Sequence, residues 1–162
     1  MKDLKECLEE SLNNTDKPIH ESAKDEKVFW QWIEDLGGEE VIEVINKSAR
    51  NDYEDFYKLV SGLGTTTDEF EKFVDIFYEK SNAILELIED DDDAGMSDDG
   101  CEYASWSSPF YGKKKYEKAL KSEDWRSVSD KYEGENCGYA MDSDSYEEWL
   151  EDNVGEPKGY AK

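Results

Sequence analysis

The sequence predicts a mainly α-helical, single-domain bundle with an acidic loop and a more irregular C-terminal half. Three observations support this fold class. Apolar residues recur at the three- and four-residue spacing of amphipathic helices. Capping residues and glycines separate these stretches, and no stretch alternates apolar and polar residues as a strand does. The length of 162 residues fits one domain, which we expect to cover 1–162.

Two helices are predicted in the first forty or so residues. Leucines at a spacing of four predict a short helix over 2–13, followed by a polar linker to residue 24. A second helix is expected over about 25–36, and Gly37-Gly38 ends it. The leucines are Leu4, Leu8 and Leu12, and the inward side chains of the second helix are Val28, Phe29, Trp32, Ile33 and Leu36.

Two longer helices are predicted to complete a helical core over 25–89. One runs from about 39 to 61, and the next opens with a capping box in which Thr66 is the cap and Glu69 lies three residues later. The first carries Val41, Ile42, Ile45, Ala49, Tyr53, Phe56, Tyr57 and Val60, and the second carries Phe70, Phe73, Val74, Phe77, Ile84, Leu85 and Ile88.

The C-terminal half has weaker periodicity. An acidic loop is expected over 90–100, and residues 101–162 are expected to form shorter helices and loops. Ser97 is placed to cap a short helix that stops near Pro109. Further helices are predicted over 113–121 and near 140–153, with a turn at 122–125 between them.

The charge is the strongest functional signal in this sequence. The sequence has 43 Asp and Glu against 19 Lys and Arg, which gives a net charge of −24. A net charge of magnitude ~2–8 is enough to keep a small domain soluble. Residues 51–100 hold 16 acidic against 3 basic residues, a net of −13, and no base lies between Lys80 and Lys113. Such a protein repels nucleic acid and anionic membranes and attracts basic protein surfaces.

Two groups of carboxylates are therefore candidate partner-binding residues, with aromatic side chains of the long helices as anchors. The first group is Asp68, Glu69, Asp75, Glu86, Glu89, Asp90, Asp91, Asp92, Asp93, Asp98 and Asp99. The second acidic patch, which contains no base, is Asp142, Asp144, Glu147, Glu148, Glu151 and Asp152. The five tryptophans, Trp30, Trp32, Trp106, Trp125 and Trp149, are expected mostly in the core, with one or two at the interface.

Four elements of the chain are similar to a bacterial family, domain-of-unknown-function family 4240. They are Phe29-Trp30-x-x-Ile33-Glu34, the run Gly95-Met96-Ser97-Asp98-Asp99-Gly100-Cys101-Glu102-Tyr103 followed by Trp106, Lys115-Tyr116-Glu117-Lys118-Ala119-Leu120, and Tyr146-Glu147-Glu148. The resemblance covers about 27–154 and implies a mainly helical fold of bacterial or phage origin. The family's Phe-x-Tyr-Phe-Arg-x-Trp-Leu segment is replaced by residues 101–109 here, so its Arg is absent.

Metal, cofactor and catalytic sites are not expected. Read as an EF-hand loop from Asp90, the sequence has Asp92 and Gly95 in register, but Cys101 occupies the position of the bidentate Glu. The only histidine, His20, falls in the predicted linker. Cys7, Cys101 and Cys137 are expected to be reduced thiols whose acidic neighbours raise their pKa. We therefore predict no enzymatic activity, and lysines 113–121 are interpreted as balancing neighbouring acids.

These observations predict a small cytoplasmic inhibitor that neutralises a basic, nucleic-acid-binding protein. Two settings share this physics: an immunity protein against a nuclease toxin, and a phage or plasmid antidefence protein that mimics DNA. An acidic housekeeping or salt-adapted protein is the alternative, and a weak cation-binding protein a further one. No direct nucleic-acid binding is expected, because the negative charge repels polyanions. No membrane association is expected either, since no apolar run could act as a signal peptide or a membrane span. The oligomeric state stays open.

Overall fold

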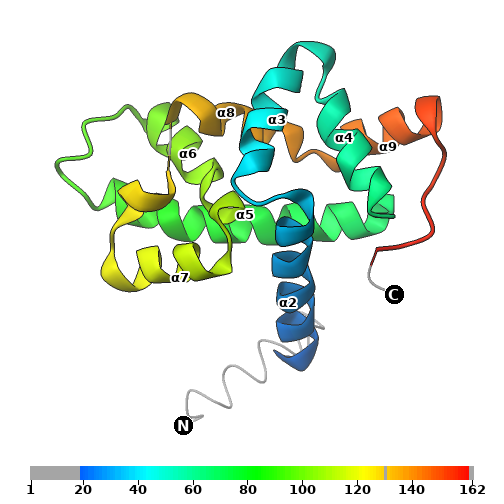
Figure 1. The fold of residues 1–162 in the computed structure, drawn as a ribbon. Coiled ribbons are helices and arrows are strands. Elements are labelled where there is room, and N and C mark those ends of the chain that lie inside the picture. Colours follow the sequence, from blue (N-terminus) through cyan, green and yellow to red (C-terminus); the bar gives the residue numbers. More distant parts are fainter. Residues whose placement is uncertain (1–18, 130, 161–162) are drawn as a thin grey trace, which may run out of the picture.

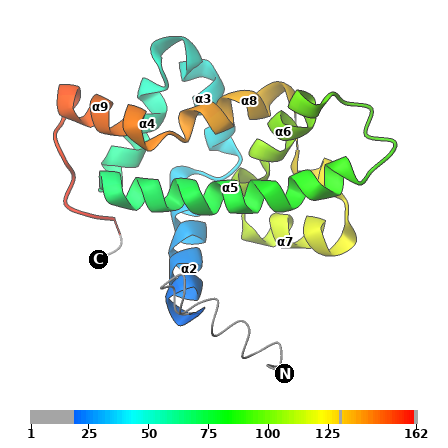
Figure 2. The same cartoon turned by 180° about the vertical axis from the view of Figure 1, so that it is seen from behind.

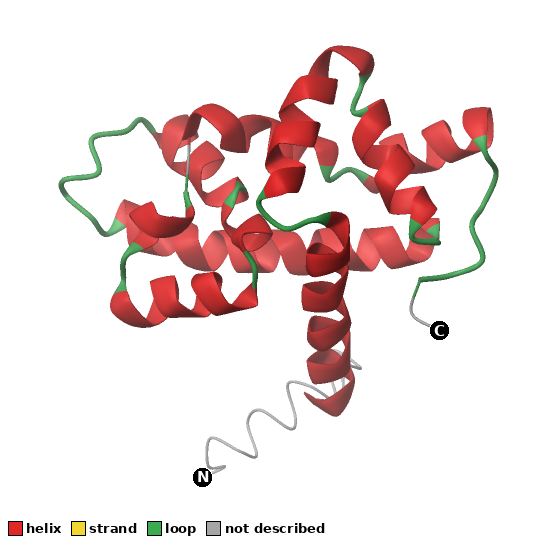
Figure 3. Cartoon of the chain, in the orientation of Figure 1, coloured by secondary structure: helices red, strands yellow, loops and turns green. Residues whose placement is uncertain are grey.

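The chain folds into helices joined by loops, with no strand among the residues that the structure describes (Figure 3). The structure is a computed structural model that describes residues 19–129 and 131–160. Its α-helices are α2 (Ile19–Leu36), α3 (Glu40–Ser48), α4 (Glu54–Gly62), α5 (Thr67–Glu89), α6 (Asp98–Trp106), α7 (Lys113–Ser122), α8 (Lys131–Ala140) and α9 (Ser143–Asn153). Short 3-10 helices are η1 (Ala49–Asn51), η2 (Ser108–Tyr111) and η3 (Trp125–Val128). The mainly α fold class is confirmed.

Helix α5 is the axis of the molecule (Figures 1 and 2). Its 23 residues span about 34 Å at ~1.5 Å per residue. In both views α3, α4, α6, α8 and α9 lie on one side of α5, and α2 and α7 lie on the other. Helices α6, α9, α7 and α2 all contact α5 directly. The two ends of α5 are therefore the two ends of the protein, which matters for where the charges lie.

One aromatic core joins the N-terminal and C-terminal halves, as expected for a single domain. The rings of Trp32 and Phe73 are 4.5 Å apart at their centroids, and those of Phe70 and Tyr146 are 4.7 Å apart. Thr65 connects three elements, because its Oγ1 accepts a hydrogen bond from Trp32 Nε1 at 3.0 Å and its carbonyl accepts one from Tyr146 OH at 2.6 Å. The polar groups of Trp32 and Tyr146 are thereby satisfied in the core.

The start and end signals of the predicted helices are confirmed at several points. Thr66 and Glu69 form the complete capping box of α5, with hydrogen bonds of 3.1 and 2.9 Å. Ser97 Oγ accepts from Gly100 N at 3.1 Å and so caps α6. Consequently, the acidic loop is shorter than predicted and covers 90–97, because 98–100 belong to α6.

The predicted helix over 39–61 is wrong as a single element. The chain forms α3, η1 and α4, because Asp52 and Tyr53 adopt left-handed backbone angles with φ of 58° and 65°. Asn51 Oδ1 accepts a hydrogen bond from Glu54 N at 3.3 Å, which satisfies one free amide at the new helix start. The apolar stripe continues across this break because both helices pack on the same core.

Two other helix boundaries differ from the prediction. Helix α2 begins at Ile19 rather than near 25, so the backbone of His20 lies in a helix and not in a linker. The helix predicted near 140–153 begins at Ser143, because Asp142 is its cap and accepts from Asp144 N at 3.0 Å. The predicted helix over 2–13, the break before Pro18, and Cys7 lie outside the described residues.

Helix α8 was not predicted, and it packs against α6 by close backbone approach. A Cβ added at Gly134 would lie 1.8 Å from the carbonyl oxygen of Tyr103, and one at Gly138 would lie 2.2 Å from the ring of Trp106. The two helices could not meet in this way if either glycine carried a side chain. Glycine therefore supplies the α6–α8 contact that apolar residues supply elsewhere.

The C-terminal segment returns to the start of α5 (Figure 1). Glu156 accepts hydrogen bonds from the N and Oγ1 of Thr67 at 2.6 and 2.9 Å. Gly159 N donates to Gly64 O at 2.9 Å, and Tyr160 N donates to Glu69 Oε1 at 2.8 Å. Glu156 satisfies one free amide of the first turn of α5, where negative charge is also favoured.

Candidate functional site

Most of the predicted partner-binding carboxylates gather at the C-terminal end of α5. They come from the last two turns of that helix, from the loop over 90–97 that projects from this end in Figure 1, and from the first turn of α6. We call this surface the acidic end; its residues are Glu86, Glu89, Asp90, Asp91, Asp92, Asp93, Asp98 and Asp99. All are exposed except Asp91, which is half-buried.

The charges at the end of α5 oppose the field of that helix. The C-terminus of a helix carries partial negative charge and favours cations, yet no base lies in the last turn of α5. Asp98 and Asp99 are in the opposite situation, at the N-terminus of α6, where negative charge is favoured. Helix electrostatics thus account for the carboxylates of α6 but not for those that end α5.

Asp91 is a structural residue within this surface. Its Oδ2 accepts hydrogen bonds from Trp125 Nε1 at 2.9 Å and from Arg126 Nη1 at 3.0 Å, while its Oδ1 accepts from Asp93 N at 2.9 Å. The Asp93 amide, Trp125 and Arg126 together hold the pKa of the Asp91 carboxyl below its usual range. The guanidinium lies 4.2 Å from the centroid of the Trp125 ring. Asp91 therefore fixes the acidic loop to η3.

The neighbours of Asp91 are left for other contacts. No ion pair involves Asp90, Asp92 or Asp93 in the part of the chain that the structure describes. The sequence did not distinguish these three from Asp91. The sequence held one clue that one of the four aspartates has an internal partner. Arg126, which follows Trp125, is the only arginine after the acidic run.

Three predicted residues lie away from the acidic end. Asp68 is exposed at the opposite end of α5, and Asp75 is exposed near the middle of that helix. Glu69 is occupied by the capping box and by the amide of Tyr160. The eleven carboxylates of the first predicted group therefore do not form one continuous patch.

The second predicted patch lies on α9, far from the acidic loop in both ribbon views (Figures 1 and 2). Asp142 caps the helix and also accepts from Ser145 Oγ at 3.1 Å. The other five residues are exposed on α9: Asp144, Glu147, Glu148, Glu151 and Asp152. The protein thus presents acidic surfaces at both of its ends.

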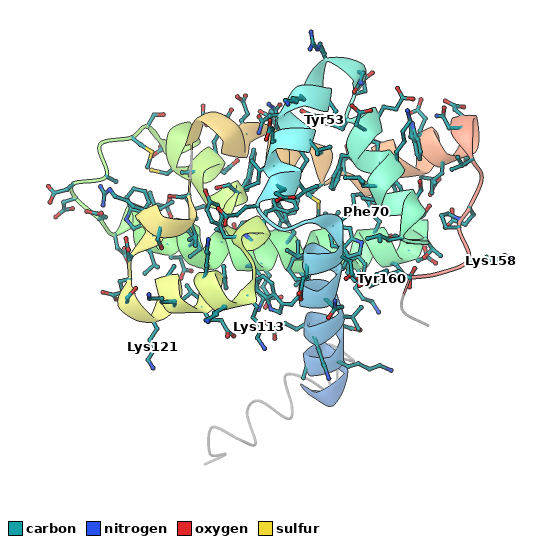
Figure 4. All side chains as sticks on the ribbon, in the orientation of Figure 1. Tyr53, Phe70, Lys113, Lys121, Lys158 and Tyr160 are labelled. Atoms are coloured by element: carbon teal, nitrogen blue, oxygen red, sulfur yellow. The ribbon has the colours of Figure 1, made fainter. Side chains whose placement is uncertain are left out.

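The lysines of α7 lie among acids. Lys115 Nζ is 2.6 Å from Glu39 Oε2, and Figure 4 shows Lys113 and Lys121 at opposite ends of the helix. A groove of about 910 Å³ beside them is lined by lysines, including Lys113, and also by glutamates, including Glu34 and Glu117. Its mixed charge is unlike the continuous positive channel that binds a polyanion.

Groups for metal binding do not converge within the described residues. No three Asp, Glu, His or Cys side chains there could hold one metal ion. Cys101 is buried, and burial, followed by the charges of Asp98 and Glu89, raises the pKa of its thiol. The neutral thiol is a poor nucleophile. Cys137 is also buried.

No family model, curated protein or solved structure matches this chain. The resemblance to family 4240 therefore stays a prediction. Among the helices of the described residues, none has the length and apolar character needed to cross a membrane.

Proposed function

We propose that the protein is a small acidic inhibitor of a basic, nucleic-acid-binding protein in the cytoplasm. The acidic end carries this proposal. Seven of its eight carboxylates are exposed and make no ion pair within the described residues, and three of them, Glu86, Glu89 and Asp90, end a helix whose dipole disfavours them. Charges that cost the folded state energy and have no internal partner fit a role in binding a cationic surface.

The alternatives make different demands on the surface. A salt-adapted protein needs acids distributed over its whole exterior, whereas here half of the net charge lies within residues 51–100. A cation-binding protein needs converging ligands, and the described residues hold no such group. The immunity and antidefence settings require the same surface, so the identity of the partner decides between them.

The test begins with a partner captured from host extract by the immobilised full chain at low salt. The captured protein is purified and its nucleic-acid binding is measured as the chain is added. We expect the chain to displace the nucleic acid and to bind none itself at physiological salt. A partner whose contact surface is acidic, or whose nucleic-acid binding is unchanged, would overturn the proposal.

Charge variants locate the contact. Replacing Asp90, Asp92 and Asp93 with Asn removes three charges and leaves the structural Asp91 in place. The matched control replaces three exposed glutamates away from the acidic end with Gln: Glu34, Glu71 and Glu79. We expect the loop variant to lower the association rate constant about tenfold at low salt and the control to lower it much less, because steering depends on charge near the contact. Equal effects would assign the binding to net charge alone.

A further inference from the structure

A groove of about 410 Å³ lies between the start of α4, helix α8 and helix α9. Its size falls in the range of ~300–1,000 Å³ that is usual for ligand sites. Acidic side chains line it from two elements that are distant in sequence: Asp52 precedes α4, and Glu148 and Asp152 lie on α9. The last two belong to the second acidic patch, which the sequence predicted without the groove.

Aromatic rings line the same groove. Tyr53, Tyr139 and Trp149 come from the α3–α4 turn, from α8 and from α9 (Tyr53 is labelled in Figure 4). Tyr139 is 49% exposed. The phenol groups are held in place, because Tyr53 OH donates to Asn136 Oδ1 at 2.9 Å and the hydroxyls of Tyr103 and Tyr139 are 3.3 Å apart. The rings are thus ordered before any ligand arrives.

Three of the carboxylates that line the groove have no internal ion-pair partner, whereas Glu54 pairs with Lys58. None of the described residues that line it is Lys or Arg, and Asp52, Glu148 and Asp152 make no ion pair with any described base. The indole Nε1–H of Trp149 is buried and has no acceptor. A buried donor without an acceptor is unfavourable.

We propose that this groove binds an arginine side chain of the basic partner, and the proposal rests on the function proposed above. A guanidinium is planar, stacks on aromatic rings and donates two parallel hydrogen bonds to a carboxylate, so it matches the rings and the carboxylates of this groove. A lysine ammonium would pair with the carboxylates, but it lacks the planar group that stacks on the rings and donates two parallel hydrogen bonds. A bare metal ion has no planar group that could stack on the rings. The carboxylates supply the charge complementarity and the rings supply the shape.

The experiment follows the five tryptophan indole signals of the 15N-labelled full chain by NMR at physiological salt. The probe is a blocked Gly-Arg-Gly peptide, and the Trp149 signal is identified by its loss in Trp149→Phe. We expect the peptide to shift that signal in a saturable way. The isosteric peptide with neutral citrulline in place of arginine should not. Equal shifts with citrulline, or shifts confined to other tryptophans, would overturn the inference.

Two variants on the same helix separate a local site from a general charge effect. Glu148→Gln and Glu147→Gln remove the same charge from neighbouring exposed positions, but only Glu148 lines the groove. We expect Glu148→Gln to weaken peptide binding about threefold to fivefold, as for one exposed ion pair, and Glu147→Gln to weaken it less than about twofold, since screening reduces distant charges. Equal losses, or tighter binding of spermidine than of the peptide at the Trp149 signal, would contradict the proposal.

Failure of this inference is distinguishable from failure of the proposed function. If the captured partner is displaced from nucleic acid by wild-type chain and by both glutamine variants alike, the groove is not part of the contact and the proposed function stands. If the arginine peptide occupies the groove but the chain leaves the partner on its nucleic acid, the inhibitor function is wrong.

Discussion

Replacing Gly138 with Ala should destabilise the protein through the contact between α6 and α8. The added Cβ would lie 2.2 Å from Trp106 Cε3 and 2.3 Å from Trp106 Cδ2, whereas carbon atoms in contact are separated by ~3.5–4.0 Å. The helices would have to separate by at least about 1.3 Å at this point. Trp106 is buried and packs on Tyr103 and Tyr139, so its ring has little room to move.

The magnitude follows from two opposing effects. Overpacking a core costs about 1–3 kcal/mol, and a clash with a buried ring belongs at the upper end of that range. Alanine recovers up to about 1 kcal/mol over glycine inside a helix. The net loss of about 2 kcal/mol should lower the melting temperature by about 4–8 °C for a chain of this size.

Thermal unfolding followed by far-ultraviolet circular dichroism measures this loss. The control is Gly62→Ala at the exposed end of α4, where an added Cβ meets no atom within 4 Å. We expect that variant to melt at the wild-type temperature or slightly above it. A Gly138→Ala protein that melts with or above the wild type would refute the close packing of α6 and α8.

Three further predictions concern the free chain. Tyr146→Phe removes the donor to the Thr65 carbonyl at 2.6 Å and should cost about 1 kcal/mol of unfolding free energy in urea titrations; no loss would contradict this bond. Because the folded pKa of Asp91 is lowered, its stabilising contribution is complete above the unfolded value of about 3.9 and disappears as the pH falls through the folded value. Asp91→Asn should therefore lower the melting temperature at pH 7, and its gap to the wild type should narrow as the pH falls below about 4; a constant gap would show that the charge is irrelevant. Finally, raising NaCl from 20 to 300 mM should raise the wild-type melting temperature, because salt screens the repulsion behind a net charge of −24, and a decrease would contradict this view of the surface.

Local chemistry explains which helices could be predicted from the sequence. Helix α5 has a complete capping box and a regular apolar stripe, so its start and its inward face follow directly from the residue pattern. Helix α8 has no such stripe. It is buried through Gly134 and Gly138, and a period of apolar residues cannot reveal packing in which backbones approach each other.

The break before α4 was hidden for a different reason. Left-handed angles at Asp52 and Tyr53 turn the chain, yet apolar residues before and after the turn face one core. The spacing of apolar residues shows that both segments face the same core, but it does not show that the chain changes direction between them. Asp52, which has a short polar side chain that tolerates this conformation, was the local sign of a turn.

The candidate sites, like the helices, were predictable from the sequence only in part. The sequence located the acidic runs, because charge is a property of composition. It could not show that Asp91 has internal partners, that the two acidic patches lie at opposite ends of α5, or that Asp52 meets Glu148 in one groove. Each of these depends on contacts between residues more than thirty positions apart.

The dependence of the association rate on salt tests the central claim most directly. The captured partner and the full chain are mixed at ionic strengths from 50 to 500 mM, and the association and dissociation rate constants are measured separately. The account predicts that association slows at least about tenfold over this range while dissociation changes much less, because screening removes steering between the acidic surface and a basic one. An association rate that is independent of salt would contradict it.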